Sequence, residues 1–362
     1  MNSKKRVLIA PLNWGLGHAS RCVPIINYLI SQNFEIVIAA HGNALLFLKQ
    51  EFPNEKILPL EDNKMQYFKK TPAWLSIFFQ LPFLIINIVK EKKLIQKIVN
   101  EQNINVIISD NRYGLRTKST LNILISHQLN VDAGILSFIP NAIIHSFVSK
   151  FDYCLIPDSQ NFEDSLAGKL SHPKKTMLNK VRFIGPISRY QKTNSTQKNT
   201  IPVLISGPEP LKSKLIENLI IHLKKSSFSY VLLCGNAENF SSQTYDNIII
   251  KNHDSTQNIN KMLNEAALVV ASGGYSSLMD MYCLDKKSIL IPFHGQTEQE
   301  YLAKFHEKSK KFTFVKMKEI ESLDFAWDSM IKDRLSNNEE SAYINQSSIP
   351  QFQDVISQIL KQ

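Results

Sequence analysis

The clearest indication of the fold is the segment Leu268-Val-Val-Ala-Ser-Gly-Gly-Tyr-Ser-Ser-Leu-Met-Asp280. Its first four residues are uninterrupted apolar residues, which is typical of a strand buried on both faces of a parallel sheet. Gly273 and Gly274 then predict a tight turn, and Ser276 and Ser277 open a helical pattern. A strand, a Gly-Gly turn and a helix in this order predict one βα unit of a doubly wound sheet.

The same order of strand and helix recurs along the chain. Residues 20–31 carry the apolar spacing of a helix, whereas residues 191–200 are polar without an apolar period and are interpreted as a linker. The sequence therefore predicts an α/β protein with two tandem Rossmann-like doubly wound domains, residues 1–190 and 201–347. The predicted strands are 7–10, 35–40, 106–109, 121–126, 154–157 and 181–184, then 202–205, 230–233, 247–250, 268–271 and 288–291.

Composition narrows the class of protein. The chain has 362 residues, of which 43% are hydrophobic and 20% charged, so it can bury two cores and an extended disordered protein is excluded. Four scattered cysteines form no CxxC pair, which argues against a disulfide scaffold or a structural zinc. A polar, basic start is followed at once by a strand-like run, so we expect no signal peptide and a cytoplasmic location.

The net charge of +10 is unevenly distributed. Residues 1–190 hold 23 basic and 13 acidic residues, a balance of +10, whereas residues 191–362 hold 19 of each, a balance of zero. A partner of the first domain is therefore expected to be anionic: nucleic acid, an acidic membrane surface or a phosphorylated acceptor. No nucleic-acid-binding module is found in the sequence, so nucleic acid is not the expected partner.

Residues 74–89 are almost entirely apolar, and Lys90, Lys92, Lys93 and Lys97 follow. The segment is shorter than the roughly 20 residues that a membrane-spanning helix needs. Two interpretations stay open. It is either a buried helix or a segment that contacts a membrane, with its aromatic side chains in the interface and the lysines on anionic head groups.

A second Gly-rich turn, Asn13-Trp-Gly-Leu-Gly-His18, follows the first predicted strand. It resembles the start of a dinucleotide-binding fingerprint, but Ser20 replaces the third glycine and no acidic residue ends the next strand. Gly15 and Gly17 leave room for a ligand near the backbone. His18 then lies at a helix start, where the helix dipole favours the neutral form of a general base. The spacing by itself favours a purely structural role of His18, as a cap or a packing residue, over that of a base.

Further polar residues follow the other predicted strands, at the edge where doubly wound sheets bind ligands. The glycines and serines of segment 272–280 form the pattern of a phosphate site, and Asp280 could accept from a ribose diol. Each group also fits an ordinary turn or a satisfied structural network. The remaining candidates are Gly207 for a diphosphate, Gln296, Glu298 and Gln299 for sugar hydroxyls, and Asp110, Asn111, Arg112, His127 and Gln128 for the acceptor side together with Gly15 and Gly17.

Three of these motifs taken together, at residues 15–18, 272–280 and 292–299, resemble the GT-B glycosyltransferases. The MurG-like enzymes and the UDP-glycosyltransferases are the most similar groups. The resemblance covers nearly the whole chain and is strongest over residues 265–305. It implies a GT-B fold with a cleft between an acceptor domain, 1–190, and a nucleotide-sugar domain, 201–347. It also implies that residues 348–362 form a helix that packs back on the first domain.

The same resemblance implies roles for individual residues. His18 matches the loop histidine that serves as base, and Gly273, Gly274, Ser276 and Ser277 match the phosphate-binding turn. Asp280 matches the acidic residue on the ribose, and Glu298 and Gln299 match the pair that contacts the sugar. Three departures stand out. The loop at 206–209 has fewer glycines than the MurG-like pattern, residues 295–297 lengthen the last motif, and His127-Gln128 matches only part of the acceptor motif.

The sequence therefore predicts a glycosyltransferase of the hexosyl or N-acetylhexosaminyl type that uses a nucleotide-diphosphate sugar, UDP-linked by preference. Transfer would be inverting, with His18 as the base, and metal-independent, because no DxD motif joins the nucleotide site. No cofactor is expected beyond the nucleotide sugar. The acceptor is expected to be lipid-linked or anionic, with peripheral contact at the inner face of the membrane. A UDP-sugar epimerase on the same fold and a non-catalytic nucleotide- or lipid-binding protein remain as alternatives.

Overall fold

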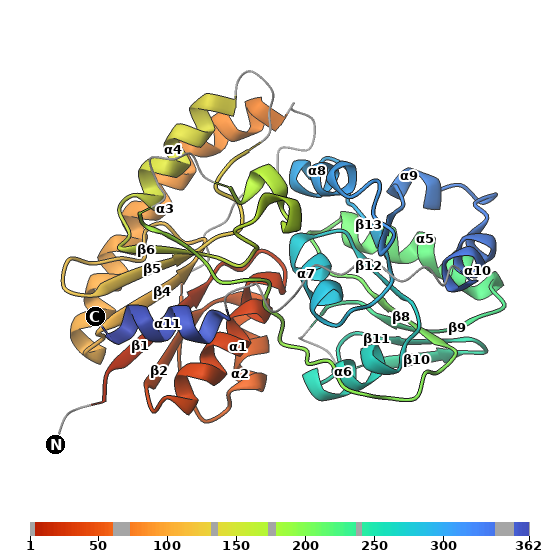
Figure 1. Cartoon of the computed structure of the whole chain (residues 1–362), viewed down its shortest axis with the longest axis horizontal. Coiled ribbons are helices and arrows are strands. Elements are labelled where there is room, and N and C mark those ends of the chain that lie inside the picture. Colours follow the sequence, from red (N-terminus) through yellow and green to blue (C-terminus); the bar gives the residue numbers. More distant parts are fainter. Residues whose placement is uncertain are drawn as a thin grey trace. The chain divides into compact units, whose positions relative to one another are not determined.

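The computed structural model describes residues 4–60, 73–131, 137–172, 179–236, 241–336 and 351–361, without the side chains of 73–84 (Figure 1). The chain divides into two compact units, and each is described separately. Unit 1 comprises Met1–Asn13, Arg21–Ile187 and Asn345–Gln362. Unit 2 comprises Trp14–Ser20 and Ser188–Ile344.

Unit 1 contains a parallel sheet of seven strands in the order β3-β2-β1-β4-β5-β6-β7. The central strands are apolar and buried, as the sequence predicts. Helices connect most successive strands, which gives a doubly wound arrangement. The strands are β1 Arg6–Pro11, β2 Glu35–Ala40, β3 Lys56–Pro59, β4 Val106–Asp110, β5 Leu121–Ile125, β6 Tyr153–Ile156 and β7 Val181–Phe183, and the α-helices are α1 Gly17–Ser31, α2 Gly42–Glu51, α3 Ala73–Gln102, α4 Phe138–Val148 and α11 Phe352–Lys361.

Unit 2 contains a second sheet of seven strands in the order β10-β11-β9-β8-β12-β13-β14. Its strand pairs are parallel except β10 with β11. The two sheets confirm the predicted α/β class. The strands are β8 Thr200–Leu204, β9 Ser229–Leu233, β10 Ser242–Tyr245, β11 Ile248–Lys251, β12 Val269–Ser272, β13 Ser288–Ile291 and β14 Phe312–Phe314, and the α-helices are α5 Leu211–Lys225, α6 Thr256–Glu265, α7 Tyr275–Cys283, α8 Thr297–Phe305, α9 Met317–Ile320 and α10 Trp327–Ser336.

Helix α11 belongs to unit 1, although all of unit 2 precedes it in the chain. The ring of Phe352 lies edge-on to that of Tyr28 in α1, with centroids 5.9 Å apart. Lys5 Nζ donates to the carbonyl oxygen of Leu360 over 3.2 Å, and Ile356, Ile359 and Leu360 are buried. Unit 1 is therefore completed by the last described helix of the chain.

Helix α3 spans the apolar segment 74–89, and the side chains of 74–84 lie outside the described residues. From residue 85 onward one face is buried and the other is not: Ile88 is 6% exposed, whereas Ile86 is 51% and Val89 48% exposed. Where its side chains are described, α3 therefore has one buried face and one exposed face. Within the described residues, no helix combines the length and the apolar character needed to span a membrane.

Candidate functional site

The loops that follow β8, β12 and β13 meet at one edge of the unit 2 sheet, because these neighbouring strands are parallel. Gly273 N donates to the carbonyl oxygen of Ile291 over 2.8 Å, which joins the loop after β12 to the end of β13. The hydroxyls of Ser206 and Ser272 lie 3.4 Å apart, which joins the loops after β8 and β12. The structure therefore brings together three of the loops that the sequence singled out.

Two glycines permit this close approach. A Cβ at Gly273 would lie 2.8 Å from the backbone nitrogen of Pro292, and a Cβ at Gly207 would lie 2.3 Å from the Phe293 ring. Real Cβ atoms do not come so close to other heavy atoms. Both glycines are thus required by packing between loops, whether or not a ligand also uses the space.

The start of α7 differs from the other helix starts at this edge. Its N-cap residue is Gly274, which has no side chain to cap the helix, and its first turn contains no acidic residue. By contrast, Ser255 caps α6, and Glu298 and Glu300 lie in the first turn of α8. The partial positive charge of the α7 start is therefore not offset by a neighbouring carboxylate of its own first turn, which favours an anionic ligand there.

The start of α5 is already occupied by Glu209. Its carboxylate accepts from Ser213 Oγ over 2.8 Å and from Ser213 N over 3.3 Å, and it pairs with Lys212 Nζ at 2.9 Å. Burial disfavours ionisation of Glu209, but the hydrogen bonds from Lys212 and Ser213 outweigh it, so the pKa is lowered. A diphosphate would compete with this carboxylate for the α5 start. The predicted contact of Gly207 with a diphosphate stays a prediction.

Asp280 lies in α7 and accepts a 2.5 Å hydrogen bond from the hydroxyl of Ser188. Burial raises the pKa of Asp280 from 3.8 to about 6, although Ser188 and the charge of Arg189 act in the opposite direction. Ser188 precedes Asp280 by 92 residues, and no sequence pattern pointed to this partner. The carboxylate is thus held by a protein hydroxyl at the place where the resemblance puts a ribose.

We expect Asp280→Asn to raise the thermal stability of the protein at pH 8. A carboxylic acid whose pKa is raised on folding stabilises the folded state fully below its unfolded pKa of 3.8 and loses that contribution as the pH rises through about 6. Asparagine removes the cost of ionisation, up to about 3 kcal/mol, and its oxygen can still accept from Ser188. Thermal unfolding at pH 8 and pH 4 measures the effect, and most of the gain should be lost at pH 4. A variant that melts below wild type at pH 8 would contradict this assignment.

The three residues predicted for the sugar lie at the start of α8. Gln296 is its N-cap residue, and Glu298 lies in its first turn. Gln299 Oε1 accepts from the backbone nitrogen of Phe293 over 2.8 Å. Its amide nitrogen is directed toward Gly274, at which a Cβ would lie 3.7 Å from Nε2. Gln299 therefore presents a hydrogen-bond donor to the α7 start, and its oxygen is used by the protein.

His18 is the second residue of α1, and the turn that contains it is grouped with unit 2. A Cβ at Gly17 would lie 2.6 Å from Ser276 Oγ, so the turn before His18 lies directly against the α7 start. Gly15 has a φ of +73°, which favours glycine, and open space where its Cβ would be. The structure thus brings the two Gly-rich motifs of the sequence together.

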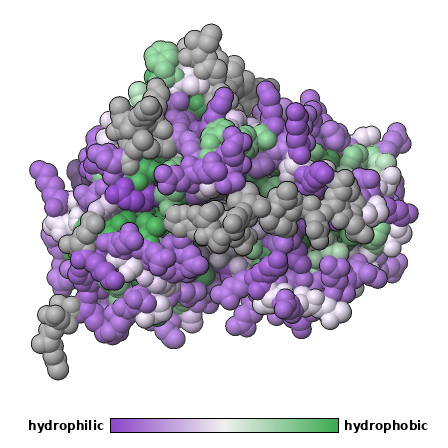
Figure 2. Space-filling view, viewed as in Figure 1, coloured by the Kyte–Doolittle hydropathy of each residue, from purple (hydrophilic) through white to green (hydrophobic). Residues whose placement is uncertain are grey.

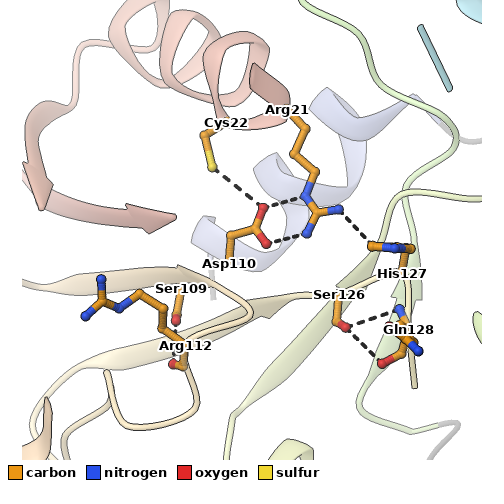
Figure 3. A network of polar contacts seen from close by, with 8 residues as sticks. All are labelled: Arg21, Cys22, Ser109, Asp110, Arg112, Ser126, His127 and Gln128. Atoms are coloured by element: carbon orange, nitrogen blue, oxygen red, sulfur yellow. Dashed lines mark hydrogen bonds and ion pairs between the residues drawn. The ribbon is translucent and has the colours of Figure 1, made fainter. Parts of the chain in front are cut away.

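Five of the residues predicted for the acceptor side lie in unit 1, in the loops after β4 and β5 (Figure 3), whereas Gly15 and Gly17 are grouped with unit 2. The five are Asp110, Asn111, Arg112, His127 and Gln128. Asp110 receives two hydrogen bonds from the guanidinium of Arg21, and Arg21 Nη1 lies 2.8 Å from His127 Nδ1. Gln128 N donates to Ser126 Oγ over 3.3 Å. Asp110 is fully buried and His127 is 5% exposed, so these groups form an internal network. No sequence pattern pointed to Arg21, although it lies one helical turn after His18.

Arg112 is engaged in a second buried ion pair. Its Nε and Nη2 atoms each lie 2.9 Å from Glu91 Oε1, and Glu91 Oε2 accepts from the backbone nitrogen of Gly114 over 3.0 Å. Arg112 is 2% exposed. The preceding residue, Asn111, has a φ of +54°, which asparagine tolerates better than most residues. The loop after β4 is therefore tied to α3, and its predicted contact with an acceptor stays a prediction.

Comparison with known proteins gives the fold a name. Residues 208–359 match the glycosyltransferase family 28 C-terminal domain. The spinosyn rhamnosyltransferase SpnG, solved with thymidine diphosphate, superposes with a TM-score of 0.64 at 11% identity, over 99% of this chain and 100% of that one. SnogD from Streptomyces nogalater (TM-score 0.62, 12% identity) and Acinetobacter baumannii MurG (0.54, 13%) also match over 99% of this chain and 100% of theirs. The chain has the fold of the GT-B glycosyltransferases. No curated protein sequence matches it.

The GT-B fold confirms the resemblance that the three sequence motifs predicted. The family 28 match begins one residue after Gly207 and includes the starts of α5, α7 and α8. It does not test the roles of individual residues, which stay predictions. Across the described ranges, no group of three or more His, Cys, Asp or Glu side chains is placed to hold a metal ion.

Proposed function

We propose that this GT-B protein is a glycosyltransferase that moves a hexosyl or N-acetylhexosaminyl group from a UDP-sugar to an acceptor hydroxyl. The observation that carries the proposal is the family 28 match over the part of unit 2 that contains the α7 start. That start has a glycine N-cap and no acidic residue in its first turn. The thymidine diphosphate in complex with SpnG supports a nucleoside diphosphate as the leaving group.

In the proposed reaction, His18 takes the proton of the acceptor hydroxyl as the oxygen attacks the anomeric carbon, which inverts the configuration. The bond from the anomeric carbon to the diphosphate breaks, and the α7 start stabilises the negative charge of the leaving group. The contact between Gly17 and Ser276 supports this arrangement, because it places the turn before His18 against the α7 start. Asp280 accepts from the ribose, in exchange for its bond with Ser188.

A thermal-shift titration without added metal tests the sugar donor. UDP, TDP, GDP, NAD and the corresponding sugar nucleotides are added to the full chain, and a ligand at about 100 times its Kd raises stability by about 2.7 kcal/mol. We expect UDP and one UDP-sugar to raise the Tm and NAD to leave it unchanged. Ser276→Ala at the α7 start should weaken the response, whereas the matched change Ser213→Ala at the occupied α5 start should not. A response to NAD alone, or to no nucleotide, would contradict the proposal.

We further propose that unit 1 takes a lipid-linked or anionic acceptor at the inner face of a membrane. Three cations gather around the loop after β4. The backbone nitrogen of Arg116 donates to the carbonyl oxygen of Gly114. Lys92 is the next residue after Glu91, whose carboxylate accepts from the backbone nitrogen of Gly114. Lys150 lies over the ring of Phe147, which stacks on the ring of Tyr113. The charges of Arg116 and Lys150 add to burial in lowering the pKa of Lys92. Within the described ranges, no ion pair joins Lys92, Arg116 or Lys150 to a carboxylate.

Apolar side chains are exposed on α3, which contains Lys92, and on α4, which ends two residues before Lys150. Ile86 and Val89 of α3 are 51% and 48% exposed, and Phe138 and Ile139 of α4 are 61% and 46% exposed. Figure 2 shows hydrophobic surface over α4 at the top of the view. A unit that exposes both apolar side chains and these cations fits the boundary between acyl chains and anionic head groups.

Vesicle flotation tests the membrane contact. The full chain should float with vesicles that contain phosphatidylglycerol and stay behind with pure phosphatidylcholine vesicles. Phe138→Ser should reduce flotation, whereas the matched change of the exposed Leu323 in unit 2 to serine should not. Equal binding to both kinds of vesicle, or none to either, would overturn this part of the proposal.

A further inference from the structure

The hydrogen bonds around Asp110 determine which nitrogen atoms carry a hydrogen (Figure 3). Arg21 Nε donates to Asp110 Oδ2 over 2.5 Å, and Arg21 Nη2 donates to Asp110 Oδ1. The third nitrogen of the guanidinium, Nη1, lies 2.8 Å from His127 Nδ1. Arg21 is 1% exposed and Asp110 fully buried, so the guanidinium is directed to these two partners inside unit 1.

A guanidinium carries only hydrogen-bond donors and does not lose its proton in proteins. At a separation of 2.8 Å, His127 Nδ1 must therefore accept the hydrogen of Arg21 Nη1, and it cannot carry a hydrogen itself. The single ring proton of His127 is then on Nε2. The partner thus selects the tautomer, as is usual for a histidine whose other nitrogen is engaged.

The charges of the cluster agree with this assignment. Cys22 Sγ lies 3.9 Å from Asp110 Oδ2. Burial and the negative charge of Asp110 raise the pKa of the Cys22 thiol well above its usual value, so the thiol is protonated and directs its hydrogen to Asp110. One cation, Arg21, and one anion, Asp110, then balance. A protonated imidazole beside the guanidinium would leave a net buried positive charge, which is costly.

We propose that Arg21 is a positioning residue that fixes His127 as the neutral tautomer with its proton on Nε2. In this form His127 donates a hydrogen bond to an oxygen of the acceptor and cannot take the acceptor's proton. The acceptor part rests on the proposed function. His127 lies two residues after the end of β5 and Asp110 ends β4, so both lie at the edge where doubly wound sheets bind their ligands. Of the two histidines predicted for the site, only His18 is then left for the role of base.

Arginine is required for this task because of its shape. The planar fork reaches both carboxylate oxygens and still presents a third nitrogen to the imidazole. A lysine at position 21 would keep the positive charge beside Asp110, but its single ammonium nitrogen cannot hold the same three bonds in one plane. Arg21→Lys therefore separates the charge of residue 21 from its geometry.

Nitrogen NMR on the full chain labelled with [15N]histidine tests the proposal, and His127→Gln assigns the signals. In the wild type we expect His127 Nδ1 to show the shift of an unprotonated nitrogen and Nε2 that of a protonated one. Arg21→Lys should convert this into a mixture of both tautomers, whereas Cys22→Ala should leave it unchanged. A proton on Nδ1 of the wild type, or a single unchanged tautomer in Arg21→Lys, would overturn the proposal.

The wild-type spectrum alone decides the tautomer, so the proposal stays testable if Arg21→Lys does not fold. The UDP response of the wild type is measured separately on the same sample. If the wild type does not respond to UDP, the result counts against the glycosyltransferase function and leaves the tautomer assignment standing. A wild-type tautomer other than the expected one, together with an intact UDP response, would overturn the tautomer assignment and leave the glycosyltransferase function standing.

Discussion

Replacing His18 by glutamine is expected to lower the rate of sugar transfer by about 10²–10⁴-fold, the usual contribution of one general base. Glutamine fills similar space and keeps a hydrogen-bonding group, but it cannot take the acceptor's proton. His18 lies in the first turn of α1, next to Gly17, which contacts Ser276 at the α7 start. The loss should therefore appear in kcat, while the Tm response to UDP stays that of the wild type.

The measurement follows release of UDP in the presence of a total lipid extract as the source of acceptor. His145→Gln is a matched control, because His145 lies on α4 and its Nε2 is 3.2 Å from Asn130 Oδ1, in unit 1. We expect this control to keep nearly full activity. A His18→Gln variant that releases UDP at the wild-type rate would remove His18 from the mechanism. It would leave the family 28 domain match untouched.

Replacing Arg112 by methionine should cost about 3–5 kcal/mol of stability, the usual penalty for leaving one charge of a buried ion pair without its partner. Glu91 would keep its bond to Gly114 N but lose both nitrogens of Arg112. The pair has almost no contact with water, since Arg112 is 2% and Glu91 5% exposed. The midpoint of urea unfolding measures the loss.

The double variant Glu91→Met/Arg112→Met is the control for this prediction. It removes both charges and refills most of the volume, so much of the lost stability should return, as it does when buried pairs are replaced by apolar residues. The backbone nitrogen of Gly114 remains without its carboxylate, and we expect recovery to be incomplete for that reason. An Arg112→Met midpoint equal to wild type would show that the pair does not hold the loop. The predicted contact with the acceptor would then gain support.

The sheets were predictable where a strand is apolar and buried. Strand β2 has the bounds predicted for 35–40, and β13 those predicted for 288–291. Strand β10 was missed because Ser242–Tyr245 is exposed throughout and has no apolar signal. Strand β3 was missed because it is short and partly exposed at the sheet edge. Hydrophobic periodicity reports burial, so strands at the margins leave little trace in it.

The candidate site was predictable where glycines mark a turn, as at Gly273 and Gly274. It was not predictable where a polar side chain finds its partner far along the chain. Ser188 lies 92 residues before Asp280, and Arg21 lies 89 residues before Asp110. Arg21 meets Asp110 because α1 follows β1, which pairs with β4, whereas Ser188 reaches Asp280 from the segment between β7 and β8. Sequence patterns identify polar groups at strand ends, but they do not tell which of these groups the protein uses for itself.

The place of helix α11 has a consequence for the order of events during synthesis. Unit 1 is built from the beginning of the chain and from Asn345–Gln362, with Ser188–Ile344 inserted between them. While the ribosome translates that insertion, the contact partners of Tyr28 and Lys5 in α11, Phe352 and Leu360, have not yet been synthesised. Unit 2 can therefore finish folding first, against the usual order in which the N-terminal domain leads. Helix α11 then completes the unit whose sheet was started first.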